Sequence, residues 1–541
     1  MAGGQKVKVQ TGSSVVGDSA TSAVWTLLSR ISGFGRVVLI GAVLGPSYFG
    51  NLFQLANQLP WLAFDLAIGA LLGSLLVPAL VLHINNNDHE SVERVAGGFL
   101  GLIVLVFSVI VAVVVLCVGP IAELFALPVA DPTTRSQFIS TAGPLLALTA
   151  PQLVGYGVAI TGQATQHAMG HYKIPAAASI IENVVVIGTL IVFGFMFGAG
   201  VELAEVTSRH ILVLGGGSSL GVALHAAVQV WGVSSLGVRL RPRAGWRDPD
   251  VRRLIRQAIP TSGTAFLNGT RLVILLAISN TVPGGVVAFQ LALNVLNVPV
   301  ALGAKPVVHA LLPRLARAFQ SNNLYDFSDK YVRGVGFALL FTIPASVAVF
   351  SLGWIVGPGV AVGEMDTSSG RQLLVFGITG VAGAIIGDAL YHLATAASYS
   401  KSDIVGPLRA QVVRVLITIV GSVVAVQFSG PFVVLCLAVS MTLADVASGC
   451  YLHRRVARTL ARGDYRLLNS VLSSSACAVM SFGVVALAAL AVRRSIGSVS
   501  ALEALVVSGV SVVVGFGLFV ALRSRSDDEV RNAVNDVLVV T

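Results

Sequence analysis

Ser29-Arg30-Ile31-Ser32-Gly33-Phe34-Gly35-Arg36 lies inside the first apolar stretch of this chain that is long enough to cross a membrane. The guanidinium groups of Arg30 and Arg36 therefore fall at a depth where an unpaired charge costs several kcal/mol. Charged side chains are rare at such depth and usually belong to a functional site. We therefore expect a cation-lined site in the first membrane span.

The composition of the chain is that of an integral membrane protein. Of the 541 residues, 55% are hydrophobic and only 11% are charged, and the mean hydropathy is +0.85. A soluble core could not bury so many apolar side chains. Apolar runs able to cross about 30 Å of hydrocarbon recur along the chain, which predicts an all-α protein with about 14 transmembrane helices.

Neither catalysis nor a bound metal is indicated by the motifs. The four cysteines show no C-x-x-C or C-x-x-H spacing, so no disulfide framework or zinc site is expected. The chain contains no H-E-x-x-H, G-x-S-x-G or Walker sequence. We expect a transporter and not an enzyme, with no cofactor, and with coupling to a monovalent cation, a proton or the membrane potential left open.

We attribute the net charge of +10 to positive residues in the cytoplasmic loops of a membrane protein, and not to a surface that binds nucleic acid. Lys and Arg residues gather in alternate loops, most densely between residues 239 and 256. Such loops face the cytoplasm, so both termini are predicted to be cytoplasmic. The expected location is the bacterial cytoplasmic (inner) membrane, as a multi-pass protein.

An internal duplication sets the predicted architecture. Arg36-Val37-Val38-Leu39-Ile40 reappears as Arg271-Leu272-Val273-Ile274-Leu275, and Phe53-Gln54-Leu55-Ala56 reappears as Phe289-Gln290-Leu291-Ala292. The copies lie 235 and 236 residues apart, and six predicted helices separate them. Because six is even, the copies run parallel, which predicts two parallel-repeat six-helix lobes plus two extra C-terminal helices.

These signals divide the chain into six predicted segments. They are a disordered cytoplasmic tail (1–21), an N-lobe with helices one to six (22–236), a basic cytoplasmic linker (237–250), a C-lobe with helices seven to twelve (251–460), helices thirteen and fourteen (467–523) and a cytoplasmic tail (524–541).

Charged residues inside the predicted spans are the candidate site residues. Arginine grips phosphate oxygens two at a time, so a cavity lined by Arg30, Arg36, Arg271 and Lys305 suits a pyrophosphate head group. Gly33 and Gly35 could bend the first helix and bring its two arginines into one cavity. Structural ion pairs are the alternative interpretation. The carboxylates that could supply such pairs, or couple transport to an ion, are Asp65, Glu182, Asp388 and Asp445.

Polar residues near the two F-Q-L-A copies form a second candidate set. Asn57 and Gln58 precede Pro60, and Asn294 and Asn297 precede Pro299. Polar helices interrupted at matching depth mark binding sites in transporters, although hydrogen bonds between helices would use the same residues. We expect these four side chains to line the cavity.

The pattern in helices one and two resembles the MviN/MurJ lipid II flippase family of the multidrug/oligosaccharidyl-lipid/polysaccharide exporter superfamily. The residues that carry the resemblance are Ser29-Arg30-x-x-Gly33-Phe34-x-Arg36, Ala56-Asn57-Gln58-Leu59-Pro60 and Leu76-Val77-Pro78. The resemblance implies a V-shaped two-lobe transporter that moves a polyprenyl-pyrophosphate glycan outward by alternating access. It also implies that Arg30 and Arg36 contact the pyrophosphate, and that helices thirteen and fourteen form a groove for the lipid tail.

Four positions depart from the family pattern. Asn51 and Ile68 stand where the family has acidic residues in helix two, and Phe64 and Asn294 stand where it has arginines. We expect Arg271 and Lys305 to supply cationic groups in the C-lobe instead.

The sequence therefore predicts a flippase for a polyprenyl-pyrophosphate-linked glycan such as a lipid II-like peptidoglycan precursor, with that glycan lipid and membrane lipids as partners. The alternatives are a flippase for another lipid-linked oligosaccharide or wall polymer, a cation-coupled drug exporter, and a membrane scaffold that recruits cell-wall synthesis proteins through its basic loops.

Overall fold

The computed structural model describes residues 12–65, 76–86, 88–460, 465–496 and 500–526, and every regular element in this part of the chain is helical. The N-terminal half contains α1 (Gly12–Leu44), α2 (Tyr48–Phe64), α3 (Val77–Asn85), α4 (His89–Leu116), α5 (Val118–Ala126), α6 (Pro132–Thr149), α7 (Gln152–Ala168), α8 (Lys173–Phe197), η3 (Leu203–Glu205) and α9 (Ser208–Ser235).

The C-terminal half contains η4 (Gly245–Arg247), α10 (Pro249–Ser279), α11 (Gly285–Pro299), the π-helical turn η5 (Val300–Ala304), α12 (Lys305–Gln320), α13 (Leu324–Val360), η6 (Gly363–Met365), α14 (Ser368–Gly380), α15 (Ala384–Ser400), α16 (Val405–Ala425), α17 (Pro431–Ala457), α18 (Tyr465–Ile496) and α19 (Ala501–Ser526).

Twelve helices among the described residues are long and apolar enough to cross a membrane. Their outer surfaces carry fully exposed apolar side chains, such as Leu116 (84% exposed) and Phe195 (87% exposed), whose burial requires lipid. The molecule is a multi-pass membrane protein. The predicted number of fourteen spans stays a prediction, because residues 66–75 between α2 and α3 lie outside the described residues and the apolar part of α10 is the shorter segment Gly263–Ser279.

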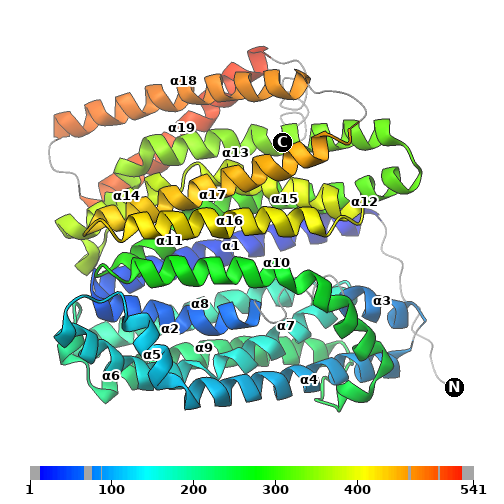
Figure 1. Cartoon of the computed structure of the whole chain (residues 1–541), viewed down its shortest axis with the longest axis horizontal. Coiled ribbons are helices and arrows are strands. Elements are labelled where there is room, and N and C mark those ends of the chain that lie inside the picture. Colours follow the sequence, from blue (N-terminus) through cyan, green and yellow to red (C-terminus); the bar gives the residue numbers. More distant parts are fainter. Residues whose placement is uncertain (1–11, 66–75, 87, 461–464, 497–499, 527–541) are drawn as a thin grey trace.

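The two halves of the chain repeat the same packing. In the N-terminal half α8 packs on α1 and α9, and α7 packs on α9; in the C-terminal half α16 packs on α10 and α17, and α15 packs on α17. In Figure 1, α7, α8 and α9 lie in the lower part and α15, α16 and α17 in the upper part, with α1 and α10 between them. The parallel repeat predicted from the sequence is therefore present in three dimensions. The extra helices α18 and α19 pack on each other and on α13.

The duplicated tetrapeptide lies where the lobes meet. Helix α11 packs on α1 and α2, and Phe53 and Phe289 are both fully buried in the same apolar core. Burial of two phenyl rings and their neighbours is worth several kcal/mol. The repeat of this tetrapeptide therefore reflects a packing role that the two copies share, and not a shared contact with a ligand.

Helix α1 begins at Gly12, inside the segment predicted as a disordered tail of residues 1–21. The residues after Gly17 contain neither glycine nor proline until Gly33, so nothing in the local sequence breaks the helix between the tail and the span. Helix α1 also continues without interruption past Gly33 and Gly35 to Leu44. The bend that would have turned Arg30 and Arg36 into one cavity does not form.

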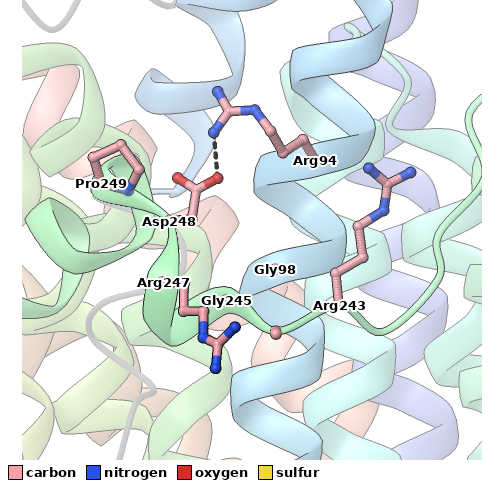
Figure 2. Close-up of a pocket in the computed structure, with 8 residues that line it drawn as sticks. Arg94, Gly98, Arg243, Gly245, Arg247, Asp248 and Pro249 are labelled. Carbon is pink, nitrogen blue, oxygen red and sulfur yellow. Dashed lines mark hydrogen bonds and ion pairs between the residues drawn. The ribbon is translucent and has the colours of Figure 1, made fainter.

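The basic linker is packed against the N-lobe. The amide of Arg243 donates to the carbonyl of Gly97 at 2.9 Å, and a Cβ on Gly101 would approach the carbonyl oxygen of Arg243 to 2.0 Å, so the linker backbone lies directly on α4. Arg94 on α4 forms ion pairs with Asp248 and Asp250 at the start of α10, beside an open cavity of about 280 Å³ (Figure 2). The linker thus ties the start of the C-terminal half to the N-terminal half. We call this end of the molecule the linker end and the opposite end the distal end.

The lobes also meet at the distal end, where the α1–α2 and α10–α11 turns touch. Asn51 is fully buried; its Nδ2 donates to Asn280 Oδ1 at 3.0 Å and to the carbonyl of Val282 at 2.8 Å, and its Oδ1 accepts from the amide of Val286 at 3.0 Å. Gly284 (φ +74°) lies so close that a Cβ would stand 2.4 Å from the Cα of Pro46. An amide from α2 therefore caps the start of α11 and closes the distal end.

Candidate functional site

Arg36 belongs to a polar cluster inside the N-lobe. Its Nη1 lies 3.4 Å from Oε1 of Glu182 on α8. Tyr156 on α7 donates its hydroxyl to the same oxygen at 3.0 Å, and Nδ1 of His225 on α9 lies 2.9 Å from Oε2. We call Arg36, Tyr156, Glu182 and His225 the N-lobe cluster. Four helices therefore converge on one carboxylate.

The two ends of the Arg36–Glu182 pair differ in exposure. The Arg36 side chain is 25% exposed, whereas that of Glu182 is 12% exposed. An exposed guanidinium edge can accept a further anion, because arginine carries five N–H donors. Arg36 thus combines an internal partner with a face that a ligand can reach.

Behind His225 the cluster continues into the bundle through two fully buried amides. Nε2 of Gln229 lies 3.5 Å from Nε2 of His225, and Nε2 of Gln166 donates to Oε1 of Gln229 at 2.7 Å. Nε2 of Gln229 also donates to the carbonyl of Pro175 at 3.3 Å. These bonds fix the imidazole from the side opposite Glu182.

The C-lobe holds a denser cluster of charges. Nη2 of Arg271 on α10 lies 2.8 Å from Oδ1 of Asp445 on α17, and Nε of Arg414 on α16 lies 3.0 Å from the same oxygen. Nη2 of Arg414 reaches Oδ1 of Asp388 on α15 at 2.7 Å. The side chains of Arg271, Arg414 and Asp445 are at most 6% exposed. Two arginines and two carboxylates thus balance one another almost out of contact with solvent.

Three further groups complete the C-lobe cluster. Nε2 of His392, one helical turn from Asp388 on α15, lies 3.3 Å from Oδ2 of Asp388. Ser448 accepts from Nε of Arg414 at 3.0 Å, and the guanidinium carbon of Arg414 lies 3.9 Å from the centre of the Tyr391 ring. The C-lobe cluster is therefore Arg271, Asp388, Tyr391, His392, Arg414, Asp445 and Ser448.

The two clusters occupy equivalent positions of the repeat. Helices α7 and α15 both have 17 residues and begin 232 residues apart, and α8 and α16 begin with the same offset. This offset relates Tyr156 to Asp388 and Glu182 to Arg414. The offset between α9 and α17 relates His225 to Ser448, and that between the ends of α1 and α10 relates Arg36 to Arg271.

Arg30 and Arg36 face different surroundings. Arg36 is held by the N-lobe cluster, whereas Arg30 is exposed, one and a half turns nearer the start of the unbroken α1. Lys305, the first residue of α12, lies within electrostatic range of both Arg30 and Asp388. Arg30 and Lys305 belong to different lobes, and an anion bound between two such cations would offset their like charges.

Arg271 does not lie where a head group could reach it. Only 5% of this residue is exposed, and its partner Asp445 is 1% exposed. That Arg271 contacts the ligand stays a prediction; in this structure its guanidinium is buried and forms an ion pair with Asp445. Of the two predicted interpretations of an intramembrane arginine, the structural ion pair applies here.

The four amide side chains are partly exposed on the interrupted helices α2 and α11. Nδ2 of Asn57 donates to the carbonyl of Phe53, and Nδ2 of Asn294 to the carbonyl of Gln290, each at 3.0 Å. Both bonds stay within one helix, so these two amides do not join neighbouring helices through them. Gln58 and Asn297 share the same partial exposure.

The carboxylates predicted for ion coupling fall into different environments. Glu182, Asp388 and Asp445 each have a cationic partner, as described above. Asp65 is the C-cap residue of α2, where its backbone N–H bonds to the carbonyls of Trp61 and Leu62, and it borders residues 66–75, which lie outside the described residues.

Sequence reasoning did not include Tyr156, His225, Arg414 and Ser448 among the site residues. Each of these positions has an equivalent position in the other lobe, which is found only by aligning the helices with the offsets of the repeat. The two lobes carry different residue types at these equivalent positions. A search for repeated letters could not find them. Asn51 was recognised only as a departure from a family pattern, and its role at the distal contact came from the structure.

Two related lobes, each with a charged cluster among the same four helices, define a two-lobe membrane transporter. Solved structures share this fold. The chain matches "Lipid II flippase MurJ, inward closed conformation" with a TM-score of 0.71 and 16% identity, covering 93% of this chain and 98% of the other. An inward-facing multidrug resistance MATE family transporter of the MOP superfamily matches with a TM-score of 0.62 and 13% identity, over 82% and 99%.

Sequence comparisons place the chain within this fold. The family model "Lipid II flippase MurJ" matches residues 40–507. A probable lipid II flippase MurJ of Rhizobium tropici is 27% identical over 72% of each chain. The lipid II flippase MurJ of Burkholderia cenocepacia is 23% identical over 76% of this chain and 78% of its own. The chain belongs to the MurJ family, and the predicted family and fold class are confirmed.

Proposed function

We propose that this protein is a flippase that moves a polyprenyl-pyrophosphate-linked glycan, of the lipid II type, from the inner to the outer leaflet by alternating access. The observation that carries the proposal is the partly exposed (25%) side chain of Arg36 inside a membrane-spanning helix. An arginine at this depth needs an anion, and a pyrophosphate offers paired oxygens that fit its planar donors. The names of the sequence relatives support the same cargo.

The proposed head-group ligands are Arg30, Arg36 and Lys305, with Asn57, Gln58, Asn294 and Asn297 lining the cavity. Arg30 and Lys305 come from opposite lobes, so a pyrophosphate between them would draw the lobes together at that depth. Arg271 is assigned to the C-lobe cluster instead. Helices α18 and α19 would guide the lipid tail along α13.

The proposed location is the bacterial inner membrane, with both termini and the linker end in the cytoplasm. The arginine-rich linker supports this orientation, because positive loops are retained on the cytoplasmic side. The contact around Asn51 then closes the outer side. The structure thus corresponds to a state closed toward the outside, in which cargo would enter from the cytoplasm.

The energy source proposed for the cycle is the membrane potential. An anionic head group moving outward is favoured by a potential that is negative inside. Asp388 and Asp445 are neutralised by Arg271 and Arg414, which argues against a monovalent cation bound at these two carboxylates.

A cation-coupled drug exporter is the second candidate, favoured by the likeness to the MATE fold. A drug exporter needs anionic side chains to bind an organic cation, whereas a flippase needs cationic side chains to bind a pyrophosphate. Transport of an organic cation should depend on Glu182 or Asp388 more than on Arg36, whereas transport of a pyrophosphate lipid should depend most on Arg36.

Native mass spectrometry of the gently extracted protein tests the proposed function. The wild type should carry a polyprenyl-pyrophosphate glycan that is lost in Arg36→Ala. The matched control is Arg333→Ala, which removes an arginine of an exposed ion pair with Asp329 and should retain the lipid. Ordinary phospholipid alone in all three proteins would overturn the assignment.

A further inference from the structure

Glu182 competes with any ligand for Arg36. The carboxylate lies 3.4 Å from the guanidinium, longer than the usual distance of a charge-assisted hydrogen bond, while its contacts to Tyr156 and His225 are 3.0 and 2.9 Å. Arg36 is therefore the most loosely held of the three partners. Its side chain is also 25% exposed, compared with 9% for that of His225.

The groups that face Glu182 come from each helix packed around it. They are Arg36 on α1, Tyr156 on α7 and His225 on α9. Among these, histidine is the type of side chain whose charge normally changes near neutral pH. The imidazole is 9% exposed and is fixed from behind by Gln229.

Removing Arg36 from this site changes its charge balance. If a pyrophosphate draws the guanidinium away, a carboxylate that is 12% exposed loses its nearest permanent cation. An uncompensated carboxylate in such surroundings costs several kcal/mol, and a proton taken up from solvent removes that cost. Binding of the cargo and binding of a proton therefore favour each other.

The C-lobe lacks this possibility because Arg414 stands at the position equivalent to Glu182. Arg414 carries a charge that is not lost at physiological pH, and it bridges Asp388 and Asp445. The C-lobe also contains a carboxylate–histidine pair, Asp388 and His392, but the arginine bound to that carboxylate is only 4% exposed, whereas Arg36 is 25% exposed. The coupling is therefore expected in one lobe alone.

We infer that the Glu182–His225 pair is a proton site that exchanges for Arg36, so that one proton is taken up when the pyrophosphate head group binds. The inference rests on the proposed function and deepens it. Glu182 acts as a positioning residue for Arg36: it holds the guanidinium when the cavity is empty, and the pair accepts the proton when the guanidinium turns to the cargo.

Isothermal titration calorimetry of the full chain in detergent measures this proton directly. The probe is a polyprenyl-pyrophosphate sugar, in which esterification of both phosphates removes their ionisation near neutral pH. Titration in buffers of different ionisation enthalpy should give an uptake of about one proton per ligand in the pH range where the pair is unprotonated in the empty protein and protonated in the complex. Over the same range the affinity should fall by up to about tenfold per pH unit as the pH rises.

Glu182→Gln removes the competing charge and keeps the shape of the side chain. Its affinity should be independent of pH and, at high pH, higher than that of the wild type. The matched control is Glu93→Gln, a carboxylate on α4 at the linker end that pairs with Arg243 and should behave as wild type. If Glu182→Gln fails to fold, the proton uptake of the wild type still decides the question, and His225→Asn supplies a second variant.

The results of these experiments distinguish a failure of the proton-site inference from a failure of the proposed function. Ligand binding without proton uptake, or an unchanged pH dependence in a folded Glu182→Gln protein, overturns the proton site and leaves the flippase standing. Absence of binding of the probe at every pH overturns the proposed function itself.

Discussion

The N-lobe cluster and the C-lobe cluster occupy equivalent positions yet differ in how firmly their charges are held. In the C-lobe, Arg414 lies between Asp388 and Asp445 and is 3% exposed. In the N-lobe, the equivalent position is Glu182, and its arginine partner Arg36 is 25% exposed. The difference indicates that one lobe is stabilised by permanent charges, while the other keeps a cation available for binding.

The largest expected effect comes from breaking the C-lobe cluster with Arg414→Ala. This change leaves Asp388 and Asp445 short of a buried cation, which should cost about 3–5 kcal/mol of stability. Thermal unfolding of the purified protein in detergent should show a marked fall in Tm. Arg371→Ala, which removes an exposed partner of Asp366, is the control and should change stability by about 1 kcal/mol or less. Equal stability of the two variants would contradict the permanent-charge view.

The second prediction concerns a substitution that should affect transport much more than stability. Arg36→Ala should reduce flipping of a fluorescent pyrophosphate lipid in vesicles to background, because no other side chain offers the same donors at that position. Its Tm should fall less than that of Arg414→Ala, since Glu182 keeps Tyr156 and His225 as partners and a proton can neutralise it. Arg36→Lys should restore only part of the rate, because an ammonium group cannot bind two oxygens in one plane. Normal transport by the alanine variant would remove Arg36 from the site.

A smaller effect concerns the contact that joins the lobes. Asn51→Ala leaves the amide of Val286 and Oδ1 of Asn280 without the Asn51 side chain as their partner, at a cost of about 1–3 kcal/mol to the closed distal end. A cysteine introduced at Thr281 should then react faster with a membrane-impermeant thiol reagent added from the distal side. The same cysteine in an otherwise unchanged chain is the reference. Unchanged reactivity would show that Asn51 does not hold this end closed.

The smallest effect on folding is expected for the cavity amides. Asn57→Ala and Asn294→Ala each remove one hydrogen bond to the carbonyl four residues earlier, which is worth about 0.5–1.5 kcal/mol. Their transport rates should fall less than that of Arg36→Ala, since neither residue carries a charge. A loss of transport as complete as that of Arg36→Ala would place the amides at the centre of head-group binding.

Much of the fold could be predicted because its signals are local or repeated. Membrane-length apolar runs, the alternation of basic loops and the two F-Q-L-A copies each depend on neighbouring residues or on matching letters. The change from α11 to the π-helical turn η5 after Pro299 was predictable for the same reason, since proline removes a backbone donor, whereas α2 continues through Pro60 to Phe64.

The site could be predicted only in part. Arg36 was found because a charge in an apolar run is conspicuous, but its partner Glu182 lies 146 residues away on another helix. Helix periodicity says which face a residue occupies and not which helix that face meets. The placement of Arg271 shows the consequence, because it is followed by a similar apolar run to that after Arg36 and yet has a different environment in space.

The sequence by itself determined that this chain is a helical membrane protein with two parallel lobes and intramembrane arginines, because hydropathy and repetition are properties of the linear chain. Only the tertiary structure decided which arginine is a permanent part of the core and which keeps an exposed edge. That choice depends on whether helix packing brings an arginine or a carboxylate to the position opposite it, and on how far the neighbouring side chains exclude water.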